Sequence, residues 1–146
     1  MVTFHLERTA PLPAPESWRR LTDWPRHGAA VPLTRVTVET APPTRPGTVF
    51  VARSGVGPLA FDDRMEVVLW QPPADDAAGR CRLEKRGRVV RGWAEIEVRP
   101  RPDGGSLVVW REEIGVRLLP GAADPLLRGA SRVVFGRAVE RLLRMP

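Results

Sequence analysis

The chain has 146 residues and a formal net charge of +6, with 23 basic residues against 17 acidic ones. This length is typical of one domain, and a chain of this size buries about 70% of its unfolded surface, so a core forms without metal ions or disulfides. Cys81 is the only cysteine, which excludes an intrachain disulfide. We therefore expect a single domain over residues 1–146, with no structural metal.

Lys85 is the only lysine among the 23 basic residues, and the chain has no asparagine and no tyrosine. This composition is typical of a GC-rich genome, so we attribute the basic balance to codon usage and expect no nucleic-acid partner. The N-terminal residues lack the pattern of a signal peptide. No apolar run approaches the roughly 20 residues that span a bilayer. We expect a cytoplasmic protein without a transmembrane segment.

The N-terminal part of the chain predicts one strand and two short helices. Residues 2–8 alternate between apolar and polar side chains, which indicates a half-buried strand. Residues 16–21 then predict a short helix, which ends before Pro25 because a residue that precedes proline avoids the helical conformation. A second short helix or turn is expected over residues 26–30.

The middle of the chain predicts six further strands. Short turns separate them, such as the Asp-Gly-Gly sequence at 103–105, and no helix intervenes. Successive strands joined in this way favour an antiparallel meander. The expected strands cover residues 35–39, 48–54, 61–70, 81–86, 89–99 and 106–116.

The C-terminal part predicts a helix of about 20 residues, roughly 30 Å long. Asp124 is the expected N-cap, and Pro125 occupies the first helical position. The expected buried stripe consists of Leu126, Ala130, Val133, Val134, Ala138 and Leu142. The expected solvated face carries Arg128, Arg132, Arg137 and Arg141. This helix is the only large partner for the apolar face of the sheet, and it cannot fill the whole concavity, so side chains or a ligand fill the rest.

Several segments resemble the START-related superfamily of polyketide cyclases, dehydrases and lipid-transport proteins, known as SRPBCC. They are residues 14–25 (APESWRRLTDWP), 47–50 (GTVF), 65–70 (MEVVLW) and the closing helix. The resemblance implies an α+β helix-grip fold: a seven-stranded curved antiparallel sheet in the order 1-7-6-5-4-3-2 around a long C-terminal helix, with two short helices after the first strand. It also implies a cavity between sheet and helix. Members bind lipids, hormones, quinones or polyketides, and only some are enzymes.

Strand alternation predicts which side chains face that cavity. Most are apolar or aromatic, and the aromatic ones could stack against a planar ligand. Trp70 and Trp93 fall on the outer face, which indicates either an interface or an error of register at a bulge. The expected ligand contacts are Trp24, Phe50, Phe61, Met65, Val67, Ile96, Trp110, Glu112, Val134 and Phe135.

Three charged residues share the predicted cavity face: Asp63, Lys85 and Glu112. Asp63 and Lys85 lie near strand ends, close to solvent, whereas Glu112 lies in mid-strand. With the implied strand order, Lys85 and Glu112 are two strands apart, about 10 Å, a gap that a ligand or a water molecule could bridge. Glu112 is thus either a polar anchor or general base, or a buried carboxylate paired within the protein. His27, in the segment that borders the cavity mouth in this superfamily, is a second acid/base candidate because its pKa suits proton transfer.

These observations leave three hypotheses for the function. The first is binding or transport of an apolar small molecule, such as a lipid, a quinone or a polyketide-like compound. The second is a polyketide cyclase or aromatase-like enzyme that uses Glu112 or His27 as acid and base. The third is an interaction domain in which the arginine face of the last helix binds an acidic protein or a membrane surface. No cluster with metal-ligand spacing and no dinucleotide motif occurs, so we expect no cofactor.

Overall fold

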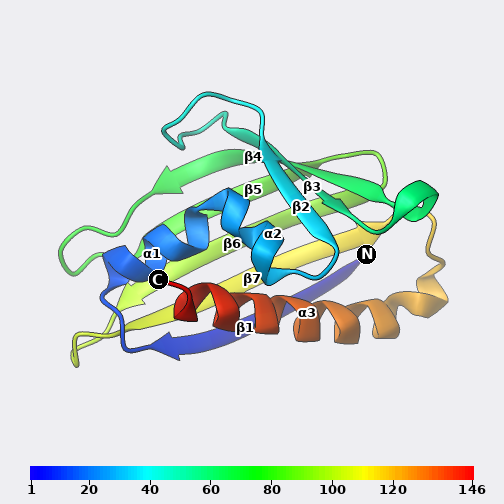
Figure 1. Cartoon of the computed structure of the whole chain (residues 1–146). Coiled ribbons are helices and arrows are strands. Elements are labelled where there is room, and N and C mark those ends of the chain that lie inside the picture. The colour runs from blue at the N-terminus through cyan, green and yellow to red at the C-terminus, as the bar shows by residue number, and fades with distance from the viewer.

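The computed structural model, which covers residues 1–146, contains a seven-stranded sheet in the order β1-β7-β6-β5-β4-β3-β2 (Figure 1). Every neighbouring pair of strands is antiparallel. This topology confirms the predicted α+β helix-grip fold and its strand order. The strands are β1 (Val2–Ala10), β2 (Thr34–Val38), β3 (Val49–Ser54), β4 (Phe61–Gln71), β5 (Gly79–Arg86), β6 (Val90–Pro100) and β7 (Ser106–Val116).

The helices all lie on one face of the sheet (Figure 1). The two short helices predicted after β1 are present as α1 (Ala14–Thr22) and α2 (Trp24–Ala30), and the long helix is α3 (Asp124–Arg144). Helix α3 packs along β1 and against α1 and α2. Two 3₁₀ turns, η1 (Gly57–Leu59) and η2 (Gly121–Ala123), complete the structure. None of the helices is both long and apolar enough to span a membrane.

The core is one cluster between the concave face of the sheet, α1 and the C-terminal half of α3. Trp18 and Leu21 of α1 are buried in it, as their spacing on one side of a short helix predicts. Val139 and Leu142 of α3 are fully buried. Helix α3 therefore joins the core through its C-terminal half, whereas the sheet contributes along its whole length, with Val2 and Ala10 at the two ends of β1 both buried.

The buried stripe of α3 differs from the predicted one. Ala138 and Leu142 are buried as expected, but Leu126 is 77% exposed and Val133 is 52% exposed. The helix carries apolar residues on two adjacent stripes, and periodicity could not decide which of them packs. Asp124 is also the first helical residue rather than the N-cap, which is Ala123. The buried residues of α3 are Ser131, Gly136, Ala138, Val139, Leu142 and Leu143.

A β-bulge corrects the predicted faces in the second half of β4. The pairing with β5 shifts between Val67 and Leu69, so that Leu69 lies opposite Arg82 on the outer face. Trp70 then lies opposite the buried Cys81 and packs on the Trp18 ring, with centroids 5.0 Å apart. The alternation rule assumes no bulge, which explains why it placed Trp70 outside and Leu69 inside.

Trp93 does lie on the outer face, as the alternation predicts, and it is half-buried there. The guanidinium carbon of Arg82 stands 4.4 Å from the centre of its ring. This cation–π contact covers an outward tryptophan within the chain itself. An interface is therefore not required to explain it.

Candidate functional site

A cavity of about 330 Å³ lies between the concave face of the sheet, α2 and the N-terminal half of α3. Its volume falls at the lower end of the range of small-molecule sites, about 300–1,000 Å³. Sixteen of the 24 residues in its wall are hydrophobic. Of the residues proposed as ligand contacts or acid/base groups, the wall contains His27, Phe50, Phe61, Met65, Trp110, Glu112, Val134 and Phe135.

Trp24, Val67 and Ile96, which we also expected to contact a ligand, are absent from the cavity wall. All three are buried in the core. Trp24 stacks on the Phe50 ring with centroids 4.5 Å apart, and its indole N–H donates to the Thr44 hydroxyl at 3.2 Å. Trp24 thus supports a wall residue from behind. Sequence alternation identifies the inward face of a strand but not which inward residues border empty space.

Aromatic rings form much of one wall. The Trp110 and Phe135 rings stack with centroids 5.7 Å apart and planes inclined by 26°. Phe135 also stacks on Phe4 at 5.7 Å, which joins α3 to β1. The exposed part of this stack offers flat apolar surface of the kind that planar ligands use.

A buried cluster of three charged side chains forms the polar part of the wall. Lys85 Nζ lies 2.7 Å from Asp63 Oδ2 and 3.1 Å from Glu112 Oε1. The side chains of Lys85 and Glu112 are 2% and 1% exposed, and that of Asp63 is 14% exposed. The expectation that Asp63 and Lys85 lie close to solvent is therefore wrong.

The expected 10 Å gap between Lys85 and Glu112 is closed by direct contact. Lys85 pairs across the strands with Gly92, which lies between β5 and β7 and has no side chain to block the lysine stem. A Cβ at Gly92 would lie 1.8 Å from the Glu113 carbonyl oxygen, so no larger residue fits there. The two residues do lie on strands that are separated by β6, and the flexible four-carbon stem of lysine spans the distance.

The carboxylates determine the charge of this cluster. Burial opposes the charge on Lys85, but Glu112 and Asp63 outweigh it and raise the pKa of Lys85, so the ammonium stays protonated. Burial also raises the pKa of Glu112, although Lys85 and the Trp110 indole offset part of the effect. That indole N–H donates to Glu112 Oε2 at 2.9 Å.

Two oxygens of the cluster have no hydrogen-bond partner in the protein: Asp63 Oδ1 and Glu112 Oε1. The contact of Glu112 Oε1 with the Lys85 ammonium is an ion pair without hydrogen-bond geometry. Buried acceptors are normally paired, because leaving one unpaired costs about 1–3 kcal/mol. Both oxygens are buried, but they belong to residues of the cavity wall, so they are candidates for contact with a ligand that reaches past the wall surface.

His27 is half-buried on the cavity wall and hydrogen-bonded to the backbone. Its Nε2 lies 2.7 Å from the Leu21 carbonyl oxygen, so Nε2 carries the proton and Nδ1 is the free acceptor. Burial lowers the pKa of His27, which keeps the ring neutral at pH 7. Its ring centre lies 6.2 Å from that of Trp110, but no hydrogen bond joins His27 to Glu112. The two acid/base candidates therefore do not form a hydrogen-bonded pair.

Sequence reasoning placed all three charged residues on the cavity face but favoured Glu112 alone. It missed the cluster as a unit, because a distance between strands says nothing about side-chain reach. One signal was available. A chain that otherwise uses arginine as its basic residue has its single lysine at an inward position of a central strand.

The sequence matches no family model, and a search of curated protein sequences finds no match. Solved structures are similar in fold. A START superfamily protein from Mycobacterium smegmatis superposes with a TM-score of 0.72 at 14% identity, covering 97% of this chain and 96% of that one. The Zhui aromatase/cyclase from Streptomyces sp. R1128 gives 0.67 at 14% identity, covering 97% and 92%. Norcoclaurine synthase from Thalictrum, in complex with a transition-state analogue, gives 0.63 at 15% identity, covering 97% and 93%. These similarities show that this chain has the helix-grip fold.

Proposed function

We propose that this protein binds an apolar small molecule in the cavity, with the molecule's polar end against Asp63, Lys85 and Glu112. The observation that carries the proposal is the combination of a 330 Å³ apolar cavity with a buried charged cluster in its wall. The rings of Trp110 and Phe135 suit a ligand that is at least partly planar.

A packing defect does not account for a cavity of this size. Protein interiors contain few voids larger than a water molecule, and an unfilled apolar void destabilises the fold in proportion to its volume. The volume of 330 Å³ equals the share of about 11 water molecules in the liquid. The aromatase/cyclase and the inhibitor-bound synthase among the similar folds also support a small-molecule site here.

A fluorescent probe tests the proposal. N-phenyl-1-naphthylamine, whose emission rises in apolar surroundings, is titrated into the wild type and into Ala94→Phe. Ala94 is buried in the cavity wall, between Leu83 and Glu112 in the sheet register, so a phenyl ring there occupies ligand space. We expect at least about a tenfold loss of affinity, equivalent to about 1.4 kcal/mol.

The matched control is Ala29→Phe, an exposed alanine on α2, which should bind like the wild type. Ala52→Phe, in the same cavity wall, is a second blocking variant in case Ala94→Phe fails to fold. Unchanged binding by a folded blocking variant would contradict the proposal, and so would the absence of probe binding to the wild type.

The second candidate function is acid/base catalysis of the cyclase or aromatase type. It is favoured by a carboxyl group with a raised pKa, Glu112, and a neutral imidazole, His27, on an apolar wall. A carboxyl group and an imidazole are the side chains that most often serve as general acid and base. A test is proton–deuterium exchange at the methyl group of 2-acetylnaphthalene, followed by NMR. If the protein catalyses proton transfer, exchange is faster than in buffer alone, and Glu112→Gln or His27→Gln removes this acceleration. Exchange at the buffer rate argues against catalysis.

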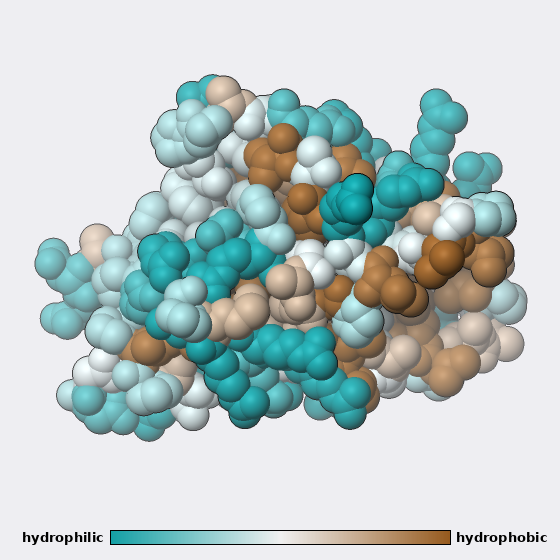
Figure 2. Space-filling model, viewed as in Figure 1, coloured by the Kyte–Doolittle hydropathy of each residue, from teal (hydrophilic) through white to brown (hydrophobic).

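The third candidate function is docking on an acidic surface, which we assign to the cavity mouth rather than to the arginine face of α3. Large exposed apolar side chains gather at the end that holds η1 and the start of α3, on the right of Figure 2. Val116 and Leu127 line both the cavity and an adjoining surface hollow that contains Leu119 and Arg117. The exposed apolar residues of this end are Leu33, Val56, Leu59, Phe61, Leu118, Leu119, Leu126, Val133 and Val134.

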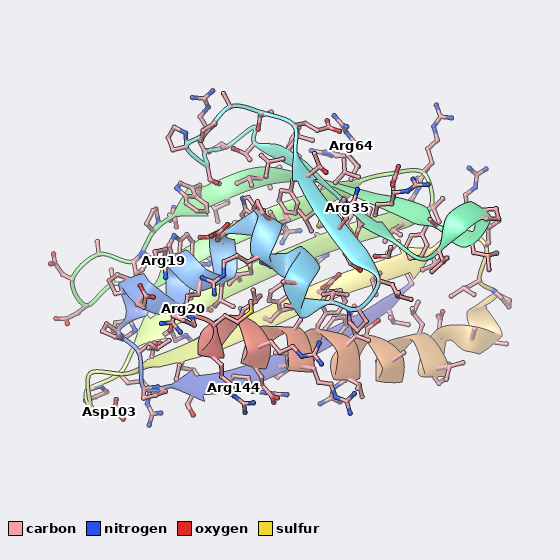
Figure 3. All side chains as sticks on the ribbon, in the orientation of Figure 1. Arg19, Arg20, Arg35, Arg64, Asp103 and Arg144 are labelled. Atoms are coloured by element: carbon pink, nitrogen blue, oxygen red, sulfur yellow. The ribbon has the colours of Figure 1, made fainter.

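Arginines without an ion pair accompany these apolar side chains, including Arg35, Arg117 and Arg128, whereas Arg19 and Arg20 at the opposite end bind Glu16 (Figure 3). Apolar side chains beside free arginines fit an anionic lipid surface. Co-sedimentation with phosphatidylglycerol vesicles should weaken in Arg117→Ala but not in Arg19→Ala, and should fade as salt rises. Equal binding by both variants, or no binding to vesicles, would count against this surface.

A further inference from the structure

The charged cluster in the cavity uses its donors within the protein and leaves acceptors unused. The Lys85 ammonium donates to Asp63 Oδ2 at 2.7 Å and to the Met65 sulfur at 3.8 Å, and it lies 3.1 Å from Glu112 Oε1. Two carboxylate oxygens accept no hydrogen bond: Asp63 Oδ1, and Glu112 Oε1, whose one polar contact is the ion pair with Lys85. A polar group that reaches this cluster therefore meets acceptors and no free donor.

The charge balance of the cluster points the same way. Two carboxyl groups face one ammonium, so the cluster has a net charge of −1 when both are ionised and 0 when one takes up a proton. Lys85 is the only lysine or arginine in the cavity wall, and His27 is neutral. An anionic group placed here would lose its water and gain no free cation, which makes its burial unfavourable.

The other polar side chains of the wall do not compete for this role. The hydroxyls of Thr34 and Ser54 lie 2.8 Å apart and bind each other. Ser131 lies on α3, across the cavity from the strands that carry the cluster. The buried carboxylates are thus the strongest hydrogen-bonding groups that the cavity offers, because charged acceptors bind donors about twice as strongly as neutral ones.

We infer that the ligand presents a hydrogen-bond donor, a hydroxyl, phenol or ammonium group, to Asp63 Oδ1 and Glu112 Oε1, and that the cavity rejects carboxylate and phosphate ends. This inference rests on the proposed function, since it names the ligand class of the same cavity. It excludes free fatty acids and phospholipid headgroups at the charged cluster. It favours phenols, apolar alcohols and apolar amines.

Three probes with the same ring system but different polar groups test this preference: 2-naphthol, 2-methoxynaphthalene and 2-naphthoate. Each is titrated at pH 7 in competition with N-phenyl-1-naphthylamine. We expect 2-naphthol to bind at least about tenfold tighter than 2-methoxynaphthalene, from the strength of hydrogen bonds to charged groups. We expect 2-naphthoate to bind most weakly of the three.

Variants assign the preference to the carboxylates. The double variant Asp63→Asn with Glu112→Gln leaves the Lys85 charge unopposed. The order of affinity of the three probes should therefore invert, with 2-naphthoate binding tightest. Glu112→Gln alone, which keeps the shape of the side chain, should reduce the preference for 2-naphthol if the double variant fails to fold. The control is Asp62→Asn, a neighbouring but exposed carboxylate paired with Arg53, which should keep the wild-type order.

The outcomes separate this inference from the proposed function. If the three probes displace N-phenyl-1-naphthylamine equally well, or if 2-naphthoate binds tightest to the wild type, the cavity binds ligands but the inference is overturned. If the wild type does not bind N-phenyl-1-naphthylamine at all, the proposed function fails and the inference fails with it. The inference is also overturned if the double variant Asp63→Asn with Glu112→Gln binds the three probes in the same order of affinity as the wild type.

Discussion

Lys85 is almost completely buried, and its two carboxylate partners make that burial tolerable. A buried ammonium is retained only where its hydrogen bonds and opposite charges replace water. Asp63 and Glu112 provide both, at 2.7 and 3.1 Å. The same contacts make the carboxylates dependent on the lysine, because either would otherwise be an uncompensated buried charge.

Replacement of Lys85 by methionine should therefore lower the free energy of unfolding by about 3–5 kcal/mol, as when one partner of a buried pair is removed. Methionine keeps most of the volume, so the loss reports on charge rather than packing. The control is Arg53→Met, which breaks the exposed pair with Asp62 and should change stability by less than about 1 kcal/mol. Urea denaturation at pH 7 measures the free energy of unfolding of both variants. An equally small loss in Lys85→Met and Arg53→Met would contradict the stabilising role of the cluster.

His27 should make the stability depend on pH. Its pKa is lowered in the folded state, while in the unfolded chain it stays near 6.5, so the unfolded state binds the extra proton as the pH falls. Acidification below about pH 6.5 therefore favours unfolding, by up to about 1.4 kcal/mol per pH unit until the lowered pKa is reached. His27→Gln should lack this part of the slope between pH 7.5 and 5.5. Parallel stability profiles for the two proteins would show that His27 is not the titrating group.

Among the elements, α3 has two roles along its length. Its C-terminal half packs into the core through Val139 and Leu142, whereas its N-terminal half covers the cavity with Ala130, Val134 and Phe135. The exposed Leu126 and Val133 of this half lie outside the packed core. The helix thus anchors at one end and leaves space at the other.

A pair of leucine substitutions tests this division of α3. Leu142→Ala removes a fully buried side chain and should lower the free energy of unfolding by about 2–5 kcal/mol. Leu126→Ala, on the same helix but 77% exposed, should change it by no more than about 0.5 kcal/mol. Thermal or urea unfolding compares the two. Similar losses at both positions would mean that the helix packs through the stripe predicted from the sequence.

The elements themselves could be predicted from the sequence, whereas two details of their faces could not. Alternation and turn residues located every strand to within about two residues, as the bounds of β7 illustrate. The bulge in β4 inverted Trp70 because one extra residue changes the face of every side chain beyond it. The rotation of α3 was missed because its apolar residues cover two stripes, and tertiary packing selects between them.

Across the whole molecule, the packed core and the cavity share one face of the sheet, and Phe50, Leu83 and Trp110 belong to both. The resemblance to helix-grip proteins implied a cavity. The alternation of side chains along the strands identified the charged residues that face it. What the sequence could not provide was the contact among Asp63, Lys85 and Glu112, which depends on the reach of the lysine and on the bare backbone of Gly92. The size of the cavity depends on the same packing.

The most direct test of the proposed cavity is a crystal structure of the wild type with 2-naphthol. The account predicts density for the ring system against Trp110 and Phe135, with the hydroxyl oxygen within hydrogen-bond distance, about 2.5–3.0 Å, of Asp63 Oδ1 or Glu112 Oε1. It would be contradicted by density outside the cavity, or by a molecule inside it whose hydroxyl points to the mouth beside Val134 and away from the carboxylates.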